Sequence, residues 1–190
     1  LSGKTVMPAI IDAHKHLAVT RDVLVDQLQH FAYYGIGVTM SMGQDTGDVA
    51  YQVRSETIPN AARFRTAGRG LAGPEPGRSN APFWITSEAE ARKAVQEMAA
   101  KKVDLLKIWV DDRDHTVTKL SPEIYRAAID EAHKQHLRAI AHIFTLEDAK
   151  GVLRAGIDVF AHSVRDRDID DEFIKMMKAR PKIIVDPNLP

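Results

Sequence analysis

Residues 6–16, VMPAIIDAHKH, decide the fold of this chain. The apolar first part is short enough for one buried strand, and the stretch ends with His14 and His16, two residues apart. Alternate residues of a strand point to the same side, so both imidazoles are expected at one point near the strand's C-terminal end. Parallel α/β architectures keep their chemistry at that end. The alternative is a pair of surface histidines in a turn, but the rest of the chain favours the strand.

The remaining sequence alternates short apolar strands with helical patterns. Strands are expected over 6–13, 36–42, part of 62–72, 103–110, 138–144, 157–163 and 182–186. Helices are expected from 21 to 34, up to about 57, and over 87–101, 121–135, 145–156 and 170–179. Ser87 with Glu90, and Thr145 with Asp148, have the spacing of helix N-terminal caps.

Repeated strand–helix units predict an α/β fold with a parallel sheet, and seven of them suggest a TIM-type (β/α)8 barrel. A complete barrel takes about 250 residues, whereas this chain has 190. We therefore expect residues 1–190 to form a single, incomplete barrel domain of about seven β/α units, without the eighth strand. Residues 73–82, rich in glycine and proline, are expected to form a mobile functional loop beside the C-terminal face of the barrel.

Composition narrows the range of partners and metal ligands. Lys plus Arg and Asp plus Glu number 26 each, so nothing in the charge suggests nucleic acid or a membrane surface as a partner. There is no cysteine, so a metal would need nitrogen and oxygen ligands. No apolar run approaches the ~20 residues of a membrane span, and no signal peptide is visible. A cytoplasmic protein with a small-molecule substrate is expected, although a secretion signal upstream of Leu1 and association into a homo-oligomer stay open.

Chemically active side chains lie at or near the C-terminal ends of further predicted strands. His142 and His162 lie on the fifth and sixth strands among apolar residues, and Lys107 lies on the fourth. A single strand histidine is more often a hydrogen-bonded core residue than a ligand. Four converging histidines would be hard to satisfy by hydrogen bonds alone, and neutral imidazole commonly binds divalent metals.

Lys107 is the only charged residue of the run LLKIWV. Burial of a lone ammonium is costly and shifts a lysine toward its neutral form. One interpretation is a packed stem with the amine extended to solvent at the barrel mouth. The other is that the neutral amine reacts with carbon dioxide to form a carbamate, which is an anionic oxygen ligand able to bridge two metals.

Together these motifs resemble the amidohydrolase superfamily, nearest the imidazolonepropionase-like subgroup. The resemblance is carried by PAIIDAHKH at 8–16, GIGVT at 35–39, Lys107 before Ile-Trp, His142 after Ala, and His162 between Ala and Ser. It covers essentially the whole chain, and both the order of the motifs and their strand assignments match.

The resemblance implies a metal-dependent hydrolase of C–N bonds in amides, cyclic amides or peptides. It implies that His14 and His16 bind one divalent metal ion, that His142 and His162 bind a second, and that carboxylated Lys107 bridges them as a catalytic residue. Zinc is the expected metal, with nickel, manganese and iron as alternatives, and a metal-held hydroxide would attack the carbonyl. Asp12 would either orient a histidine or form a turn.

One family feature falls outside the sequence. The family places an aspartate at the end of the eighth strand, and this chain ends before that strand. Asp186 could approach the metal site, but a strand-ending turn is its simpler interpretation.

Two alternatives stay open. The first is an Xaa-Pro or Xaa-Arg dipeptidase of the same superfamily, in which Arg113, Arg165 or Arg167 would hold a substrate carboxylate. For these arginines, solvated loop charge is the simpler interpretation. The second alternative is a metal-binding barrel fragment without activity.

Overall fold

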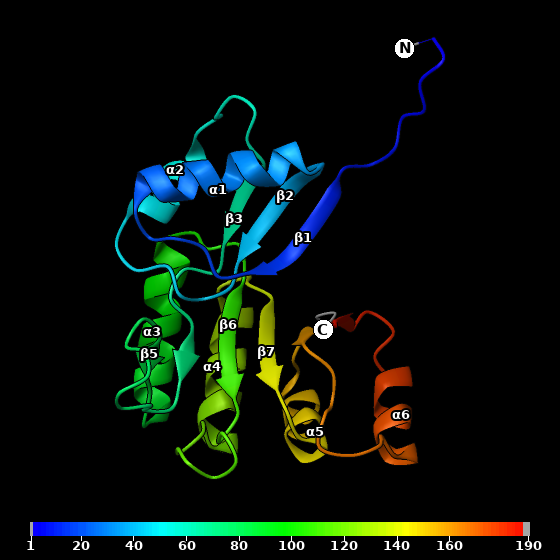
Figure 1. The fold of residues 1–190 in the computed structure, drawn as a ribbon. Helices are drawn as coiled ribbons and strands as arrows, with labels where there is room; N and C mark the ends of the chain where they lie inside the picture. Colours follow the sequence, from blue (N-terminus) through cyan, green and yellow to red (C-terminus); the bar gives the residue numbers. More distant parts are fainter. Residues whose placement is uncertain (1, 188–190) are drawn as a thin grey trace.

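The computed structural model describes residues 2–187 (Figure 1). Every pair of neighbouring strands is parallel. The elements are β1 (Ile10–Lys15), α1 (Arg21–Tyr33), β2 (Ile36–Ser41), α2 (Val49–Ser55), β3 (Arg63–Thr66), β4 (Leu71–Ala72), β5 (Phe83–Trp84), α3 (Glu88–Ala100), β6 (Leu106–Val110), α4 (Pro122–Lys134), β7 (Ala139–Ile143), α5 (Leu146–Ala155), β8 (Val159–Ala161), α6 (Asp171–Lys178) and β9 (Ile184–Asp186). Strands and helices alternate over this range except between α2 and α3, where three strands follow one another.

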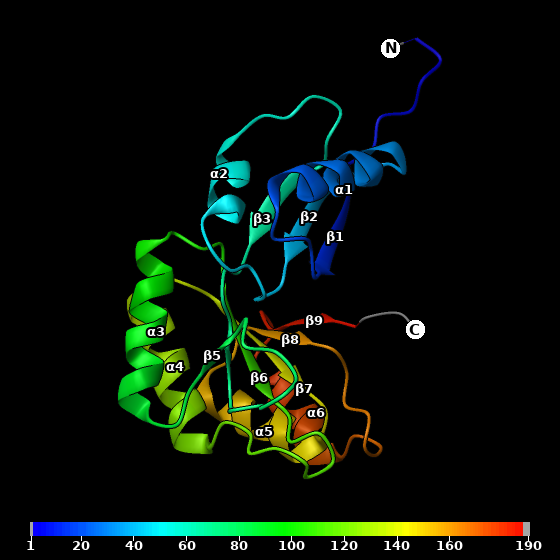
Figure 2. The ribbon, with the colours of Figure 1, turned by 60° about the vertical axis from the view of Figure 1, so that its left-hand side comes forward.

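The strands form two sheets, with the orders β1-β2-β3 and β5-β4-β6-β7-β8-β9. Figures 1 and 2 show the first sheet with α1 and α2 as a small unit, and the second with α3 to α6 as a larger unit. Within residues 2–187, no strand joins β1 to β9, so the sheets do not close into a barrel. The α/β class and the parallel strands are confirmed, whereas the expected incomplete barrel stays a prediction.

The segment 62–72, expected to contain one strand, is divided into β3 and β4. β3 pairs with β2, whereas Leu71 of β4 pairs with Ile108 of β6. Gly68, between them, has a φ of 63°, a left-handed conformation that turns the chain. The end of β3 stays tied to the residue before β6, because the backbone N–H of Thr66 donates to the Asp104 carboxylate at 2.9 Å. The expectation of one strand was wrong because the segment changes its pairing partner midway.

The first strand is shorter and more exposed than predicted. β1 begins at Ile10, and Val6 and Met7 before it are exposed. Ile10 and Ile11 are still 53% and 63% exposed. The prediction of a buried strand was therefore wrong for the described residues, because β1 lies at a sheet edge with a neighbour on one side only.

The second sheet is packed differently on its two faces. Ile108 of β6 and Ala141 of β7 belong to the main core, which includes residues of α3, α4 and α5. Ile140, the neighbour of Ala141, belongs instead to an inner cluster with Met42 and Val159. Strand alternation therefore separates a helix-covered face from an inner face, and polar side chains at inner positions meet one another.

Two of the predicted helix caps are confirmed. The Ser87 hydroxyl accepts the backbone N–H of Glu90 at 3.3 Å, and Thr145 accepts that of Asp148 at 3.1 Å. Such caps each stabilise a helix by about 1 kcal/mol. Of the helices in the part of the chain described here, none is long and apolar enough to cross a membrane.

Candidate metal centre

The structure brings the four predicted histidines together. His14 lies on β1, His16 directly after it, His142 on β7 and His162 just beyond β8. The ring centroids of His14 and His162 are 4.9 Å apart, those of His142 and His162 are 4.6 Å apart, and those of His14 and His16 are 5.5 Å apart. That these imidazoles bind metal stays a prediction.

Lys107 projects from the inner face of β6 and is fully buried, with 0% of its surface exposed. Its Nζ has no hydrogen-bond partner among the described residues. The amine lies 5.2 Å from the centroid of the Trp109 ring, within the range of a cation–π contact. The alternative of an amine extended to solvent is therefore wrong. Burial lowers the pKa of Lys107 to about 7, although the charge of Asp186 opposes the shift, so a large share of the amine is neutral near neutral pH.

Two glycines enclose the Lys107 stem. A Cβ on Gly43 would lie 2.9 Å from Cγ of Lys107 and 2.7 Å from the Trp109 ring. A Cβ on Gly70 would lie 2.8 Å from the backbone carbonyl oxygen of Lys107 and would also clash with Trp109. The chain approaches β6 this closely only because both positions lack a side chain.

The electrostatic environment keeps the imidazoles neutral. Burial, followed by the nearby charge of Lys107, lowers the pKa of His14 to about 2 and that of His16 to about 4. Burial, followed by the neighbouring His142, lowers the pKa of His162 to about 3. Neutral imidazole is the form that donates a lone pair to a metal.

An unusual backbone conformation places His162 in the cluster. Along β8, Phe160 belongs to the main core and Ala161 to the inner cluster, so simple alternation would direct residue 162 toward the helices. His162 instead has a φ of 86°, which is rare for a residue with a side chain. This left-handed turn interrupts the alternation and coincides with the approach of His162 to His14 and His142. Strain of this kind costs about 1–3 kcal/mol and is common at functional sites.

Asp186 lies closer to the cluster than its simpler interpretation implied. It ends β9, and its Oδ2 is 3.9 Å from Nδ1 of His14, too far for a hydrogen bond. Both of these atoms are buried without a hydrogen-bond partner in the described chain. Burial raises the pKa of Asp186, while the charge of Lys107 opposes the rise. Asp186 is therefore part of the site's surroundings and not merely a turn residue.

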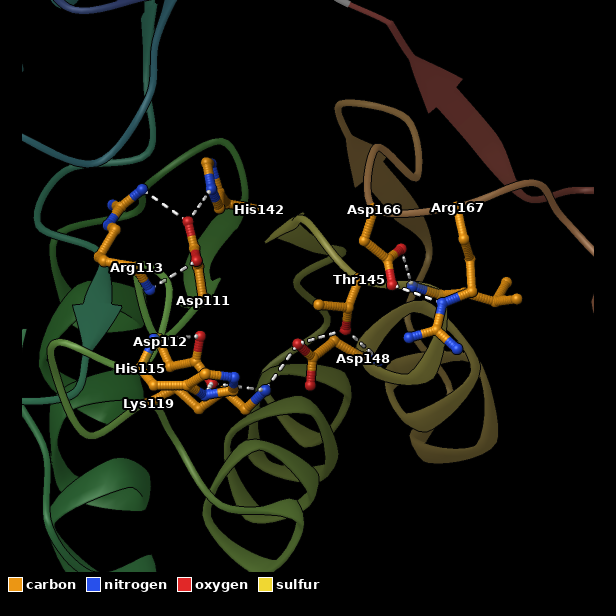
Figure 3. Close-up of polar contacts among 11 residues, drawn as sticks. Asp111, Asp112, Arg113, His115, Lys119, His142, Thr145, Asp148, Asp166 and Arg167 are labelled. Carbon is orange, nitrogen blue, oxygen red and sulfur yellow. Dashed lines mark hydrogen bonds and ion pairs between the residues drawn. The ribbon is translucent and has the colours of Figure 1, made fainter.

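Asp111 was not singled out by the sequence analysis. Its Oδ2 lies 3.0 Å from Nε2 of His142 and 2.6 Å from Nη1 of Arg113 (Figure 3). Burial would raise the pKa of Asp111, but the hydrogen bond with His142 and the contacts with Arg113 outweigh it and lower the pKa. In the sequence, only its position could have indicated this residue, because Asp111 directly follows the strand that carries Lys107.

A pocket of about 380 Å³ opens beside the imidazoles. Its lining includes all four histidines, Trp84 and Trp109, and four residues of the 73–82 loop: Glu75, Arg78, Ser79 and Pro82. The loop thus lies beside the site, where it was expected, whereas its mobility stays a prediction. Arg113 also lines this pocket.

Other candidate residues make contacts away from the pocket. Arg165 donates to the carbonyl oxygen of Ile143 at 3.2 Å, and exposed Arg167 pairs with Asp166 at 2.7 Å (Figure 3). Neither lines the pocket beside the histidines. Asp12 accepts the backbone N–H of His14 at 3.3 Å and pairs with the Lys15 amine at 3.1 Å. Asp12 lies within β1 and not in a turn, and neither of these contacts reaches an imidazole ring.

The donor set fits divalent metal ions by its chemistry. It comprises neutral imidazoles and a buried carboxylate oxygen, and the facing atoms of His14 and Asp186 lack hydrogen-bond partners within residues 2–187. In the positions seen here, no three histidine, aspartate or glutamate side chains of the described residues are arranged to hold one ion. Binding would therefore require some of these side chains to turn toward a common point.

Proteins from two mycobacterial species resemble this chain in sequence. No protein-family model matches the chain. Uncharacterized proteins of Mycobacterium tuberculosis and Mycobacterium bovis are 29% identical to it over 185 residues, covering 92% of this chain and 48% of theirs. The chain thus spans about half the length of the curated relatives it matches.

Several solved structures have a fold similar to that of this chain. A putative prolidase from Bifidobacterium longum is 28% identical, with a TM-score of 0.76, over 90% of this chain and 43% of that one. An amidohydrolase is 20% identical, with a TM-score of 0.79, over 98% and 54% of the two chains. A. niger ochratoxinase is 16% identical, with a TM-score of 0.75, over 94% and 51%. The chain therefore shares the fold of these structures over most of its own length.

Proposed function

We propose that this chain carries the metal centre of a hydrolase that cleaves C–N bonds in amides or peptides. The supporting observation is the meeting of four neutral imidazoles with the buried, unpaired amine of Lys107. Structures described as a putative prolidase, an amidohydrolase and an ochratoxinase share the fold.

Each site residue has a proposed role. His14 and His16 would bind one metal ion, and His142 and His162 would bind a second. Two divalent ions, with zinc as the expected metal, would polarise the substrate carbonyl and lower the pKa of a water molecule. Lys107, in its neutral form, would add carbon dioxide at Nζ and release a proton. The resulting carbamate would be an anionic oxygen ligand, and the two metal ions would compensate the cost of burying its charge.

The pocket supports a small substrate, with dipeptides as the second candidate class. Its volume of about 380 Å³ lies at the lower end of the range for small-molecule sites. Arg78 and Arg113 supply positive charge to its lining, although both already contact Glu75. The resemblance to a putative prolidase, at 28% identity, favours an Xaa-Pro dipeptide among C–N substrates.

Metal stoichiometry tests the site. The chain, dialysed against zinc and bicarbonate, is expected to hold about two ions, measured by elemental analysis. Lys107→Ala should hold fewer, and excess acetate or propionate should restore part of the loss by supplying the missing oxygens. His115→Ala changes an exposed histidine outside the cluster and should behave like the parent chain. Unchanged occupancy in Lys107→Ala would contradict the bridging role.

Product release tests the reaction. The zinc-loaded chain is incubated with N-acyl amides, Xaa-Pro dipeptides and Xaa-Arg dipeptides, and newly formed amines are measured. Hydrolysis confined to the dipeptides would favour the dipeptidase. Bound metal without hydrolysis of any substrate would contradict the proposed activity and favour a metal-binding barrel without turnover.

A further inference from the structure

The imidazole of His142 contacts the carboxylate of Asp111. Nε2 of His142 lies 3.0 Å from Oδ2 of Asp111, and both residues are buried. Asp111 directly follows β6 and His142 lies within β7, so two paired neighbouring strands supply the contact. A contact between adjacent strands of the main sheet places the ring more firmly than a contact with a loop tip would.

The protonation state of Asp111 determines which nitrogen of His142 carries the hydrogen. Both oxygens of Asp111 accept hydrogen bonds from Arg113, one of them from its guanidinium group, so the side chain is an ionised carboxylate that only accepts hydrogen bonds. The hydrogen of neutral His142 must then lie on Nε2, and the lone pair lies on Nδ1. That lone pair belongs to a ring whose centroid is 4.6 Å from that of His162.

Arg113 fixes the carboxylate in turn. Its backbone N–H donates to Oδ1 of Asp111 at 2.9 Å, and its Nη1 donates to Oδ2 at 2.6 Å (Figure 3). The backbone of Arg113 adopts a left-handed φ of 53°, and its Nε lies 3.6 Å from Oε1 of Glu75 in the pocket loop. Asp111 is thus oriented from two sides, with both oxygens accepting hydrogen bonds.

We propose that Asp111, oriented by Arg113, is a positioning residue that fixes the Nε2–H tautomer of His142 and presents Nδ1 to the metal site. The part of this inference that concerns metal rests on the proposed function. The part that concerns the tautomer is independent of metal. Carboxylate partners of this kind typically change metal affinity about 10–100-fold when removed.

NMR and zinc-binding measurements on the 190-residue chain test the tautomer and the metal affinity separately. Ring-¹⁵N-labelled histidine reports each tautomer by NMR without metal, and His142→Gln identifies the signals of that ring. Wild type should show the Nε2–H form. Asp111→Asn, which can donate as well as accept, should shift His142 toward Nδ1–H and weaken zinc binding about 10–100-fold.

Asp112→Asn is the matched control, because the neighbouring carboxylate contacts His115 and Lys119 instead (Figure 3). It should leave the tautomer and the zinc affinity unchanged. An unchanged tautomer in Asp111→Asn, or an equal change in Asp112→Asn, would overturn the inference. If wild type bound no zinc but showed the expected tautomer shift, the proposed function would fail while the positioning of His142 stood. If Asp111→Asn does not fold, Arg113→Gln replaces it, with weaker zinc binding supporting the inference and wild-type affinity contradicting it.

Discussion

Replacement of Lys107 by methionine should stabilise the metal-free chain in acid and lose this effect in base. The Lys107 amine is fully buried and has no hydrogen-bond partner in the described structure. Methionine has a similar unbranched length and no charge, so it can occupy the space beside Trp109 without a polar group. The variant therefore isolates the cost of burying the amine.

The magnitude follows from the pKa of Lys107, which burial lowers from 10.5 to about 7. At about 1.4 kcal/mol per pH unit, keeping the amine charged in the folded state costs about 5 kcal/mol. Loss of the amine's contact with the Trp109 ring offsets about 1 kcal/mol of the gain. Lys107→Met should therefore be about 4 kcal/mol more stable than wild type at pH 6.

The sign with pH is determined by which state binds the proton. Below about pH 7 both states bind it, so wild type carries the whole cost. Between about pH 7 and 10.5 only the unfolded state binds it, so the stability of wild type rises with pH. Above 10.5 both states are neutral and this difference between the proteins disappears.

Urea denaturation at pH 6, 8 and 10.5 measures the difference, in buffers free of metal and carbon dioxide. Lys93→Met changes an exposed lysine of α3 and serves as the control. A Lys107→Met chain no more stable than wild type at pH 6, or equally stabilised at every pH, would refute the reasoning.

Three further predictions concern the surroundings of the site. Gly70→Ala should destabilise the chain by about 1–3 kcal/mol in urea denaturation, because its Cβ would clash with Trp109 and the backbone of β6; wild-type stability would contradict this close approach. Thr145→Ala should lower the free energy of unfolding by about 1 kcal/mol in the same assay. Ser121, the N-cap residue of α4, makes no side-chain cap hydrogen bond, so Ser121→Ala should lower it less; equal losses would argue against the Thr145 cap. His162, whose pKa burial lowers to about 3, gains a proton on unfolding between about pH 6.5 and 3. The free energy of unfolding should therefore fall as the pH is lowered from about 6.5 to 3, and His162→Asn should flatten this fall in acid titrations followed by circular dichroism. An unchanged slope would show that other groups cause it.

Strand alternation made much of the site predictable. His142 and Lys107 lie at inner positions because a strand directs every second residue to one face, and the flanking apolar residues indicate which face is buried. The helix starts at Ser87 and Thr145 were also predictable, because a helix cap depends on residues only three positions apart.

Features that depend on distant contacts were not predictable. The left-handed φ of His162 interrupts the alternation that the sequence suggests. The division of the third strand depends on its change of partner from β2 to β6, and the exposure of β1 depends on its place at a sheet edge. Asp111 has no motif of its own, because its contact with His142 exists only once β6 and β7 lie side by side.

The break between β3 and β4 also has a consequence for cooperativity. Leu24 and Leu28 of α1 and Phe64 of β3 belong to a core cluster separate from the main one, so the β1–β3 unit can open with a smaller loss of buried apolar contacts. Native-state hydrogen exchange should accordingly show faster amide exchange in β1–β3 than in β6–β8. The unit that exchanges faster carries His14 and His16, and the other carries the remaining two imidazoles. A ligand bound by both pairs would link the two opening equilibria, so it should slow exchange throughout β1–β3 and not merely at the residues it contacts.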